Sequence, residues 1–400
     1  MDFGKYKVTR HLKPLQVPSK EKLLLDVSNI EDSFTGRADA SIANTFIFEA
    51  SHLIVNSLAL FEQGYFDCAF YSLRQSLEVA MTMMYLYDSE EEVRKRELEK
   101  WKSEQHFPMY AGMIKHLESN ESEFKDIKSK LSEFFDETEK VKKRLNKYVH
   151  KQGFDKLYAS RNHPLNRIKN KYGDEVFVDE FVGYVESCIG TVAVMRLAID
   201  PMPVLLNDEE IYARTGDIIT YPYSDEFIAK YIGFDAIEKY KQTSMYTLHY
   251  DCFMQEEKQN EAVSWVIKDK FVDVRRSDEI LEQGHLLSQV ELLGVIALQH
   301  IESATKFYTC GGFVMYFSNR DTLRQKQGWD SRQFDSFLEA TPSTNLPFDE
   351  VFISAFKLPI GEIFLEHNEL ISENDTYNIE YLISSLKQKT PAFKVSSYFS

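Results

Sequence analysis

The sequence is poor in residues that break helices and in residue pairs that build metal sites. Glycine occurs 16 times and proline 11 times in 400 residues, which favours long helices over a turn-rich β protein. No two cysteines form a CxxC pair, and their wide spacing is typical of neither a disulfide framework nor a cysteine zinc site. The spacing therefore indicates a reducing compartment. The four cysteines are Cys68, Cys188, Cys252 and Cys310.

Long apolar runs are also missing. The most apolar window, residues 42–60, contains Glu49, His52 and two asparagines, a mixture that a bilayer span does not tolerate. No apolar run follows the charges of the first 18 residues, which argues against a secretory signal. The HExxH, P-loop, GxGxxG and GxSxG motifs are absent as well. We therefore expect a soluble, cytoplasmic protein without membrane attachment, and we predict no metal and no cofactor.

Positive charge is scarce overall but concentrated in one segment. The formal net charge is -16, which disfavours nucleic-acid binding unless a local surface is basic. Residues 140–171 hold eight lysines and three arginines against one acid, Asp155, a local balance of +10. Lysines near a helix C-terminus also complement the helix dipole, which explains the first part of this run without a ligand. The loop part, with Arg161 and Arg167, is not explained in that way and indicates contact with phosphate or RNA.

The pattern of apolar residues predicts a mainly α protein with two domains. Residues 1–40 read as an irregular arm, and residues 41–200 read as a helical bundle. Pro201 and Pro203 mark the predicted boundary, after which residues 204–400 form a second, mostly helical domain of unknown role. The bundle helices are expected at Ile42–Gln63, Tyr65–Tyr87, Glu90–Lys102, Glu121–His150 and Glu175–Ile199.

The second domain gives weaker signals. Its longest apolar pattern predicts one helix over Asp278–Tyr308, ended by Gly311 and Gly312. Closer to the C-terminus, the segments "GGFVMYF", "VFISAF" and "GEIFLEH" suggest short strands, although the last also suits a helix.

Arg144 and His150, in the stretch "KKRLNKYVHKQGF", have side chains suited to cutting RNA without a metal. Histidine can take the proton from a 2′-hydroxyl because its pKa lies near neutrality, and arginine can grip phosphate oxygens with its two-pronged guanidinium. On an unbroken helix, however, two residues six positions apart are separated by one full turn plus about 240° around the helix axis. The two side chains can therefore meet only if the helix ends near His150, as Gly153 suggests, or if a second chain contributes.

Two segments make residues 40–200 resemble the HEPN superfamily (higher eukaryotes and prokaryotes nucleotide-binding domain) of bacterial abortive-infection and toxin proteins. One is "AFYSLRQSLEVAMTMMYLY", which carries Arg74 and Glu78. The other is "RLNKYVH", which matches the family's arginine and histidine motif with five residues between Arg144 and His150. A polar residue often follows the arginine in active members; here Leu145 takes that position and Asn146 comes next.

The resemblance implies an all-α, homodimeric, metal-independent endoribonuclease that acts as a toxin or in antiviral defence. It implies Arg144 and His150 as the catalytic pair. The residues that would support this pair are Arg74, Glu78, Asn146 and Tyr148, and the cations that would hold RNA are Lys143, Lys147, Lys151, Arg161 and Arg167.

Two alternatives remain open from the sequence. Arg74 and Glu78 lie at positions i and i+4 of an apolar helix, so they form either a structural ion pair or a support for His150. The whole protein is either this ribonuclease or a non-catalytic helical scaffold that binds a protein partner through residues 204–400.

Overall fold

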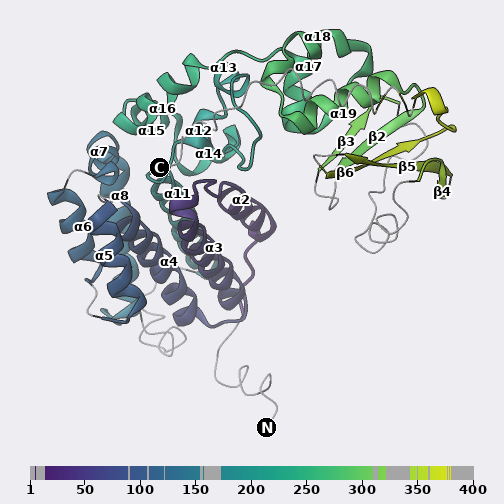
Figure 1. Ribbon diagram of the computed structural model, residues 1–400. Coiled ribbons are helices and arrows are strands. Elements are labelled where there is room, and N and C mark those ends of the chain that lie inside the picture. The colour runs from purple at the N-terminus through teal and green to yellow at the C-terminus, as the bar shows by residue number, and fades with distance from the viewer. Residues whose placement is uncertain are drawn as a thin grey trace. The chain divides into compact units, whose positions relative to one another are not determined.

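The computed structural model describes residues 5, 14–88, 91–105, 108–120, 122–153, 156, 173–309, 314–320, 343–348, 350–358, 361–375, 377 and 379. The chain is mainly helical, as the sequence predicts, with one small sheet in its C-terminal part (Figure 1). Its contacts divide the chain into two compact units. One comprises Met1–Tyr212 and Ile219–Gln255, and the other comprises Ala213–Ile218 and Glu256–Tyr398.

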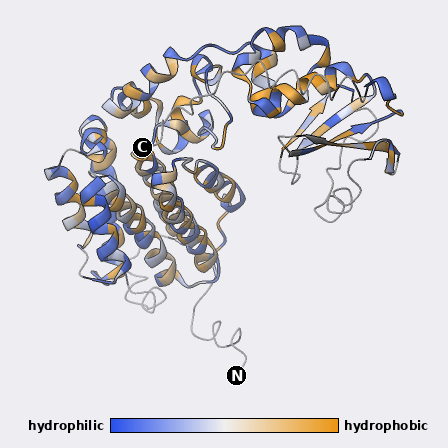
Figure 2. Ribbon diagram, viewed as in Figure 1, coloured by the Kyte–Doolittle hydropathy of each residue, from blue (hydrophilic) through white to orange (hydrophobic). Residues whose placement is uncertain are grey.

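The first unit is built on a helical hairpin of α3 (Ser41–Glu62) and α4 (Phe66–Tyr87). Gly64, with φ 81°, makes the tight turn between them, because a positive φ suits glycine best. The predicted apolar stripe of α3 is buried, and Figure 2 shows the hydrophobic sides of both helices turned into the bundle. Each fully buried leucine, such as Leu73 and Leu77 of α4, contributes about 1.5–3 kcal/mol through burial.

Helix α4 lies at the centre of the bundle, in contact with α3, α5, α6, α8 and α11. It is therefore buried over most of its surface, and its polar residues lie beside other helices rather than in solvent. The helices around the hairpin are α2 (Lys20–Asp32), η1 (Ala38–Ala40), α5 (Glu91–Lys102), α6 (Tyr110–Ser119), α7 (Glu123–Lys130), α8 (Ser132–Val149) and α11 (Asp174–Arg196). Further along the chain come α12 (Met202–Leu205), α13 (Glu209–Tyr212), α14 (Asp225–Tyr231), α15 (Phe234–Tyr240) and α16 (Ser244–Gln255).

Three predictions about the first unit need correction. The expected arm at residues 1–40 contains α2, whose Leu23, Val27 and Ile30 are buried in the core. The single helix predicted over Glu121–His150 is two helices, because Leu131 between α7 and α8 leaves the helical conformation.

The third correction concerns the domain boundary. The prolines at 201 and 203 begin the short helix α12, and the chain then packs back onto the bundle. The hydroxyl of Tyr240 donates to the carbonyl oxygen of Leu197 at 2.8 Å, and the hydroxyl of Tyr223 donates to the carbonyl oxygen of Ala193 at 3.1 Å. These contacts keep residues 219–255 in the first unit.

The second unit combines short helices with a six-stranded sheet of order β1-β3-β2-β6-β5-β4. Strands β1 and β3 pair in parallel and the other neighbours pair antiparallel. The strands are β1 (Phe271–Val272), β2 (Ala304–Thr309), β3 (Met315–Ser318), β4 (Leu346–Phe348), β5 (Val351–Leu358) and β6 (Gly361–His367). Three of them confirm the predicted short strands. The helical elements are α17 (Glu261–Ser264), η3 (Trp265–Asp269), η4 (Val274–Arg276), α18 (Ser277–Glu282), η5 (Gly284–Leu286) and α19 (Gln289–His300).

The long helix predicted over Asp278–Tyr308 is wrong. The segment contains α18, η5, α19 and then strand β2. Ser288 and Glu291 form a capping box that starts α19 afresh, and Ile301 is extended where the helix ends. In a segment that is buried on all sides, apolar residues occur without a clear helical or strand periodicity. Their pattern therefore did not show where helix gives way to strand.

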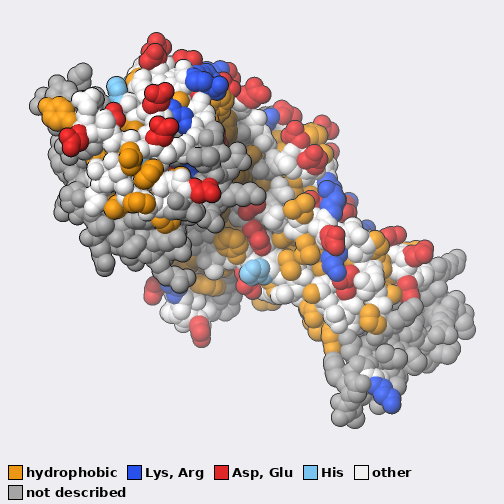
Figure 3. Space-filling view, turned by 90° about the vertical axis from the view of Figure 1, so that its right-hand side faces the viewer, with side chains coloured by type: hydrophobic (Ala, Val, Ile, Leu, Met, Phe, Trp, Pro, Cys, Tyr) orange, Lys and Arg blue, Asp and Glu red, His pale blue; other side chains and the backbone are white. Residues whose placement is uncertain are grey.

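The surface fits the acidic composition. On the face drawn in Figure 3, acidic side chains are spread among basic and hydrophobic ones. Among the described residues, no helix has both the length and the apolar character needed to cross a membrane.

Candidate functional site

Helix α8 turns one apolar side to the bundle and ends where the predicted site begins. Leu145 is fully buried, and the ring of Tyr148 stacks on Phe70 of α4 with 3.9 Å between ring centroids. The helix ends one residue before His150, whose backbone N–H donates to the carbonyl oxygen of Asn146 at 2.8 Å. The exposed His150 therefore stands at the helix C-terminus, as Gly153 suggests.

Arg74 joins α4 to the last turns of α8. Its Nε donates to Oδ1 of Asn146 at 2.7 Å, and its Nη2 donates to Oε1 of Glu78 at 2.6 Å. The Arg74 side chain is only 14% exposed, and its buried Nη1 has no hydrogen-bond partner among the described residues. Arg74 thus forms the ion pair with Glu78 and also fixes a polar side chain one turn before His150.

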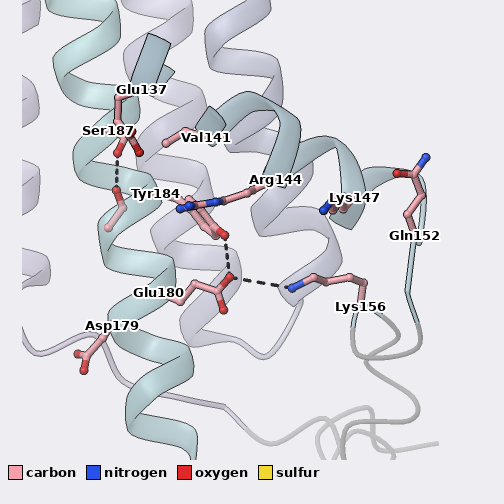
Figure 4. A pocket seen from close by; sticks show the side chains of 11 residues that line it. Glu137, Val141, Arg144, Lys147, Gln152, Lys156, Asp179, Glu180, Tyr184 and Ser187 are labelled. Atoms are coloured by element: carbon pink, nitrogen blue, oxygen red, sulfur yellow. Dashed lines mark hydrogen bonds and ion pairs between the residues drawn. The ribbon is translucent and has the colours of Figure 1, made fainter. Parts of the chain in front are cut away.

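The groove beside α8 contains Arg144 but not His150. Arg144 and Lys147 line an open groove between α8 and α11, with a volume of about 570 Å³ (Figure 4). Tyr184 of α11 lines the same groove, with its ring beside Arg144. His150 is not among the residues that line this groove, although α8 ends at Val149, directly before it. The groove therefore brings together Arg144 and α11, and not Arg144 and His150.

A carboxylate shared by two tyrosines forms the wall of the groove. Oε1 of Glu180 accepts hydrogen bonds from the hydroxyl of Tyr184 at 2.6 Å and from the hydroxyl of Tyr148 at 3.1 Å. Nζ of Lys156 donates to the Tyr148 hydroxyl at 3.0 Å and lies 4.1 Å from the centroid of that ring. Burial and the bond to Glu180 raise the pKa of Tyr184, and the nearby Arg144 opposes this rise. Tyr148 is thus committed to packing and to this network.

The charges that line the groove balance. The guanidinium of Arg144 and the ammonium of Lys147 make no hydrogen bond or ion pair with a described residue, so both remain available to a ligand. The nearby carboxylates would repel a phosphate. A phosphate would therefore bind here only in direct contact with these two cations. The cations that line the groove are Arg144, Lys147 and Lys156, and the acids are Glu137, Asp179 and Glu180.

The remaining predicted RNA contacts divide into three cases. Lys143 is exposed and lies 3.9 Å from Glu139. Lys151 forms an ion pair with Asp67 of α4 and lies 5.5 Å from the ring centroid of Tyr71, so part of its charge is used within the chain. Arg161 and Arg167 lie outside the described residues, as does most of the predicted basic loop.

The sequence did not predict the residues of neighbouring helices that contact the site residues of α8. Glu180 and Tyr184 belong to α11, and no sequence pattern links them to α8. Lys142 is different, because it falls within the apolar stripe of α8 and so carried a signal. Its side chain is 9% exposed, and its Nζ lies 3.5 Å from the ring centroid of Tyr110.

Comparison of the chain with protein-family models, with curated proteins and with solved structures gave no match. Within the described ranges, no group of three or more His, Cys, Asp and Glu side chains is placed to hold a metal ion. What the structure does place near the end of α8 are two separate groups: Arg74 with Asn146 and Glu78, and Arg144 with Lys147 in the groove beside Glu180.

Proposed function

We propose that the first unit cleaves single-stranded RNA without a metal ion, in the manner that the resemblance to the HEPN superfamily implies. The observation that carries the proposal is the end of α8. There the exposed His150 follows the last helical residue, and Arg74 fixes Asn146 one turn earlier. An exposed imidazole on a backbone that the helix end holds in place suits a general base, because proton transfer needs a base within reach of the substrate.

The proposed reaction exchanges one phosphorus–oxygen bond for another, with two proton transfers. His150 takes the proton of a 2′-hydroxyl, and the 2′-oxygen attacks the adjacent phosphorus. The bond from phosphorus to the 5′-oxygen breaks, the leaving oxygen takes a proton from water, and His150 later returns its proton to the solvent. Arg144 stabilises the charge that develops on the phosphate oxygens through paired hydrogen bonds. The products are a 2′,3′-cyclic phosphate and a free 5′-hydroxyl.

A second copy of the chain completes the site in this proposal. Arg144 faces the groove between α8 and α11, and His150 does not line it. A homodimer that sets the end of α8 from one chain beside Arg144 of the other would bring the two groups to one phosphate. Lys143, Lys147 and Lys151 would then hold the RNA strand on either side.

The biological role follows only through the resemblance. Uncontrolled RNA cleavage harms a cell, which suits a toxin or an antiviral-defence effector of the abortive-infection type. The second unit would then sense the trigger or recruit a protein partner, since its sheet and helices form a core separate from that of the bundle.

One observation favours the alternative of a non-catalytic scaffold. The groove that holds Arg144 carries as many carboxylates as cations and lacks His150. A scaffold needs neither convergence of the two residues nor a net positive groove, so under this alternative the protein binds a protein partner and leaves RNA intact.

An assay of RNA cleavage without divalent metal distinguishes the ribonuclease from the non-catalytic scaffold. Wild type, His150→Ala and His300→Ala are incubated with single-stranded RNA in excess chelator. His300 is the matched control, because it is an exposed histidine in the last turn of α19, in the second unit. We expect wild type and His300→Ala to give cyclic-phosphate ends and His150→Ala to lose at least 100-fold in rate. Equal cleavage by all three proteins, or cleavage by none of them, would contradict the assignment of His150 as the general base of a ribonuclease.

A further inference from the structure

A second pocket of about 280 Å³ opens on the other side of α8, between α6, α7 and α8. Apolar side chains make up part of its lining and include Phe124, Phe135 and Ile114. The charged side chains of the lining are Asp136, Glu139 and Lys142 of α8, together with Glu118 of α6 and Lys128 of α7, which pair with each other. An apolar lining with a few convergent polar groups is the usual form of a small-molecule site.

Lys142 has hydrogen-bonding capacity that the fold does not use. Its side chain is only 9% exposed, yet its ammonium makes a single long bond, 3.5 Å to Oε2 of Glu139. An ammonium has three donors, and a buried donor without an acceptor is unfavourable. The ring of Tyr110 offers its face to the charge at 3.5 Å but supplies no hydrogen-bond acceptor in this contact. Burial also lowers the pKa of Lys142, as expected for an ammonium held away from water.

Glu139 supplies hydrogen-bond acceptors 3.5 Å from the Lys142 ammonium. Its carboxylate accepts hydrogen bonds only, and its side chain is 39% exposed. The pocket thus presents a donor next to an acceptor beside apolar side chains. A ligand that satisfies both carries an acceptor beside one or two donors.

From this arrangement we propose that the pocket recognises a guanine base. Guanine carries the O6 acceptor beside the N1–H and N2–H donors on its Watson–Crick edge. O6 would accept from Nζ of Lys142, and the two N–H groups would donate to the carboxylate of Glu139. The ring would lie on the apolar side chains near Phe135, with the sugar and phosphate outside the pocket.

The other bases fit the pair less well. Adenine has an amino group where guanine has O6, so it would place a donor against the Lys142 ammonium. Uracil offers the acceptor but a single N–H beside it, and its one ring covers less of the apolar lining. Hypoxanthine lacks only the N2 amino group, so it isolates the contribution of one donor to Glu139.

A series of contacts links this pocket to the proposed catalytic end of α8. The ring of Tyr110 lies 3.5 Å from Nζ of Lys142 and 5.9 Å from the Arg74 guanidinium, which itself holds Asn146. The pocket does not depend on RNA cleavage, however, and its ligand is either a free guanine nucleotide or a guanine within RNA.

Calorimetry on the His150→Ala chain tests the site, because that variant leaves the RNA intact and keeps recognition separate from cleavage. GMP, IMP and AMP are titrated first. We expect GMP to bind, IMP to bind about tenfold more weakly and AMP to show no measurable binding, since one good base contact is worth about 1–3 kcal/mol. AMP binding as tightly as GMP would overturn the proposal.

Two further variants in the same background probe the pair. Glu139→Gln and Lys142→Met should each weaken GMP binding by about tenfold or more. Lys140→Met is the matched control, since Lys140 is exposed on α8 and pairs with Glu137 outside this pocket. Far-ultraviolet circular dichroism shows whether each variant is folded. GMP affinity unchanged in both folded variants would also overturn the proposal.

Short RNAs identify the source of the base. UUGUU and UUAUU are compared with GMP on the same protein. Tighter binding of UUGUU than of GMP, with UUAUU weaker than both, assigns the pocket to RNA. GMP binding at least as tightly as UUGUU assigns it to a free nucleotide. UUAUU binding as tightly as UUGUU, together with no binding of GMP, would contradict guanine recognition in either form.

Discussion

The Nε of Arg74 donates a 2.7 Å hydrogen bond to Oδ1 of Asn146, and this bond joins the middle of α4 to the end of α8. The same guanidinium pairs with Glu78 at 2.6 Å. One buried cation thus holds the helix that carries both predicted catalytic residues. The position of His150 is therefore coupled to the core of the bundle.

Arg74→Met should destabilise the first unit. The change removes two charge-assisted hydrogen bonds and leaves Glu78 without its partner, so we expect a loss of about 2–3 kcal/mol in the free energy of unfolding. Urea denaturation measures it. Arg96→Met is the control, because Arg96 is 59% exposed beside Glu97 and should change stability by less than about 0.5 kcal/mol. Equal, small losses in both variants would show that the Arg74 bonds contribute little.

Asp88 should make stability depend on pH. Its carboxylate accepts bonds from the backbone N–H groups of Glu123 and Phe124 at the start of α7, at 2.7 and 2.5 Å. Burial raises the pKa of this carboxyl to about 7, so the folded chain holds the proton more tightly than the unfolded chain. The contribution of Asp88 is therefore fully present at low pH and is lost as the pH rises through about 7.

The variant Asp88→Asn removes this titration and keeps an acceptor oxygen for one of the two backbone N–H groups. Unfolding free energies of wild type and variant are compared from about pH 4 to about pH 8, that is, from well below the raised pKa of the carboxyl to above it. We expect wild type to lose stability relative to Asp88→Asn across this range by ~1–4 kcal/mol. Parallel curves would mean that the carboxyl does not titrate there.

Two glycines of α11 should respond in opposite ways to alanine. A Cβ at Gly190 would lie 2.2 Å from the carbonyl oxygen of Tyr231, so Gly190→Ala must push α14 away and should cost about 2 kcal/mol or more. A Cβ at Gly183 meets nothing within 4 Å, so Gly183→Ala should stabilise the helix by about 0.5–1 kcal/mol. Thermal unfolding measures both. A neutral Gly190→Ala would contradict the close approach of α11 and α14.

The buried pair Lys306 and Glu366 should show a strong non-additive effect. Both side chains are fully buried on neighbouring strands β2 and β6, with 2.8 Å between Nζ and Oε1. Lys306→Met leaves an uncompensated buried carboxylate, and we expect a loss of about 3–5 kcal/mol. Lys306→Met with Glu366→Leu removes both charges and should recover most of that loss. A double variant as unstable as the single one would show that packing, and not charge, dominates.

Local patterns predicted the bundle well because its helices are amphipathic. The stripe of α3 and the turn at Gly64 are readable from spacing and from one glycine. The end of α8 at His150 was also readable, since Gly153 follows it with φ 109°.

What failed depended on contacts between distant residues. The capping box at Ser288 splits a run that looks like one helix, and the extended backbone at Ile301 leads to a strand that only a sheet partner can stabilise. At the site, Glu180 and Tyr184 come from a helix more than thirty residues from Tyr148, and no period in the sequence reports such a contact.

Mixing two inactive variants tests the central claim most directly. Arg144→Ala and His150→Ala are purified separately, mixed in equal amounts, allowed to exchange subunits and assayed for cyclic-phosphate products in excess chelator. If Arg144 of one chain acts with His150 of the other, half of the dimers regain one of two sites, and the mixture should reach about a quarter of wild-type activity while each variant alone stays inactive. A mixture no more active than either variant, or a wild type that leaves RNA intact, would contradict the account.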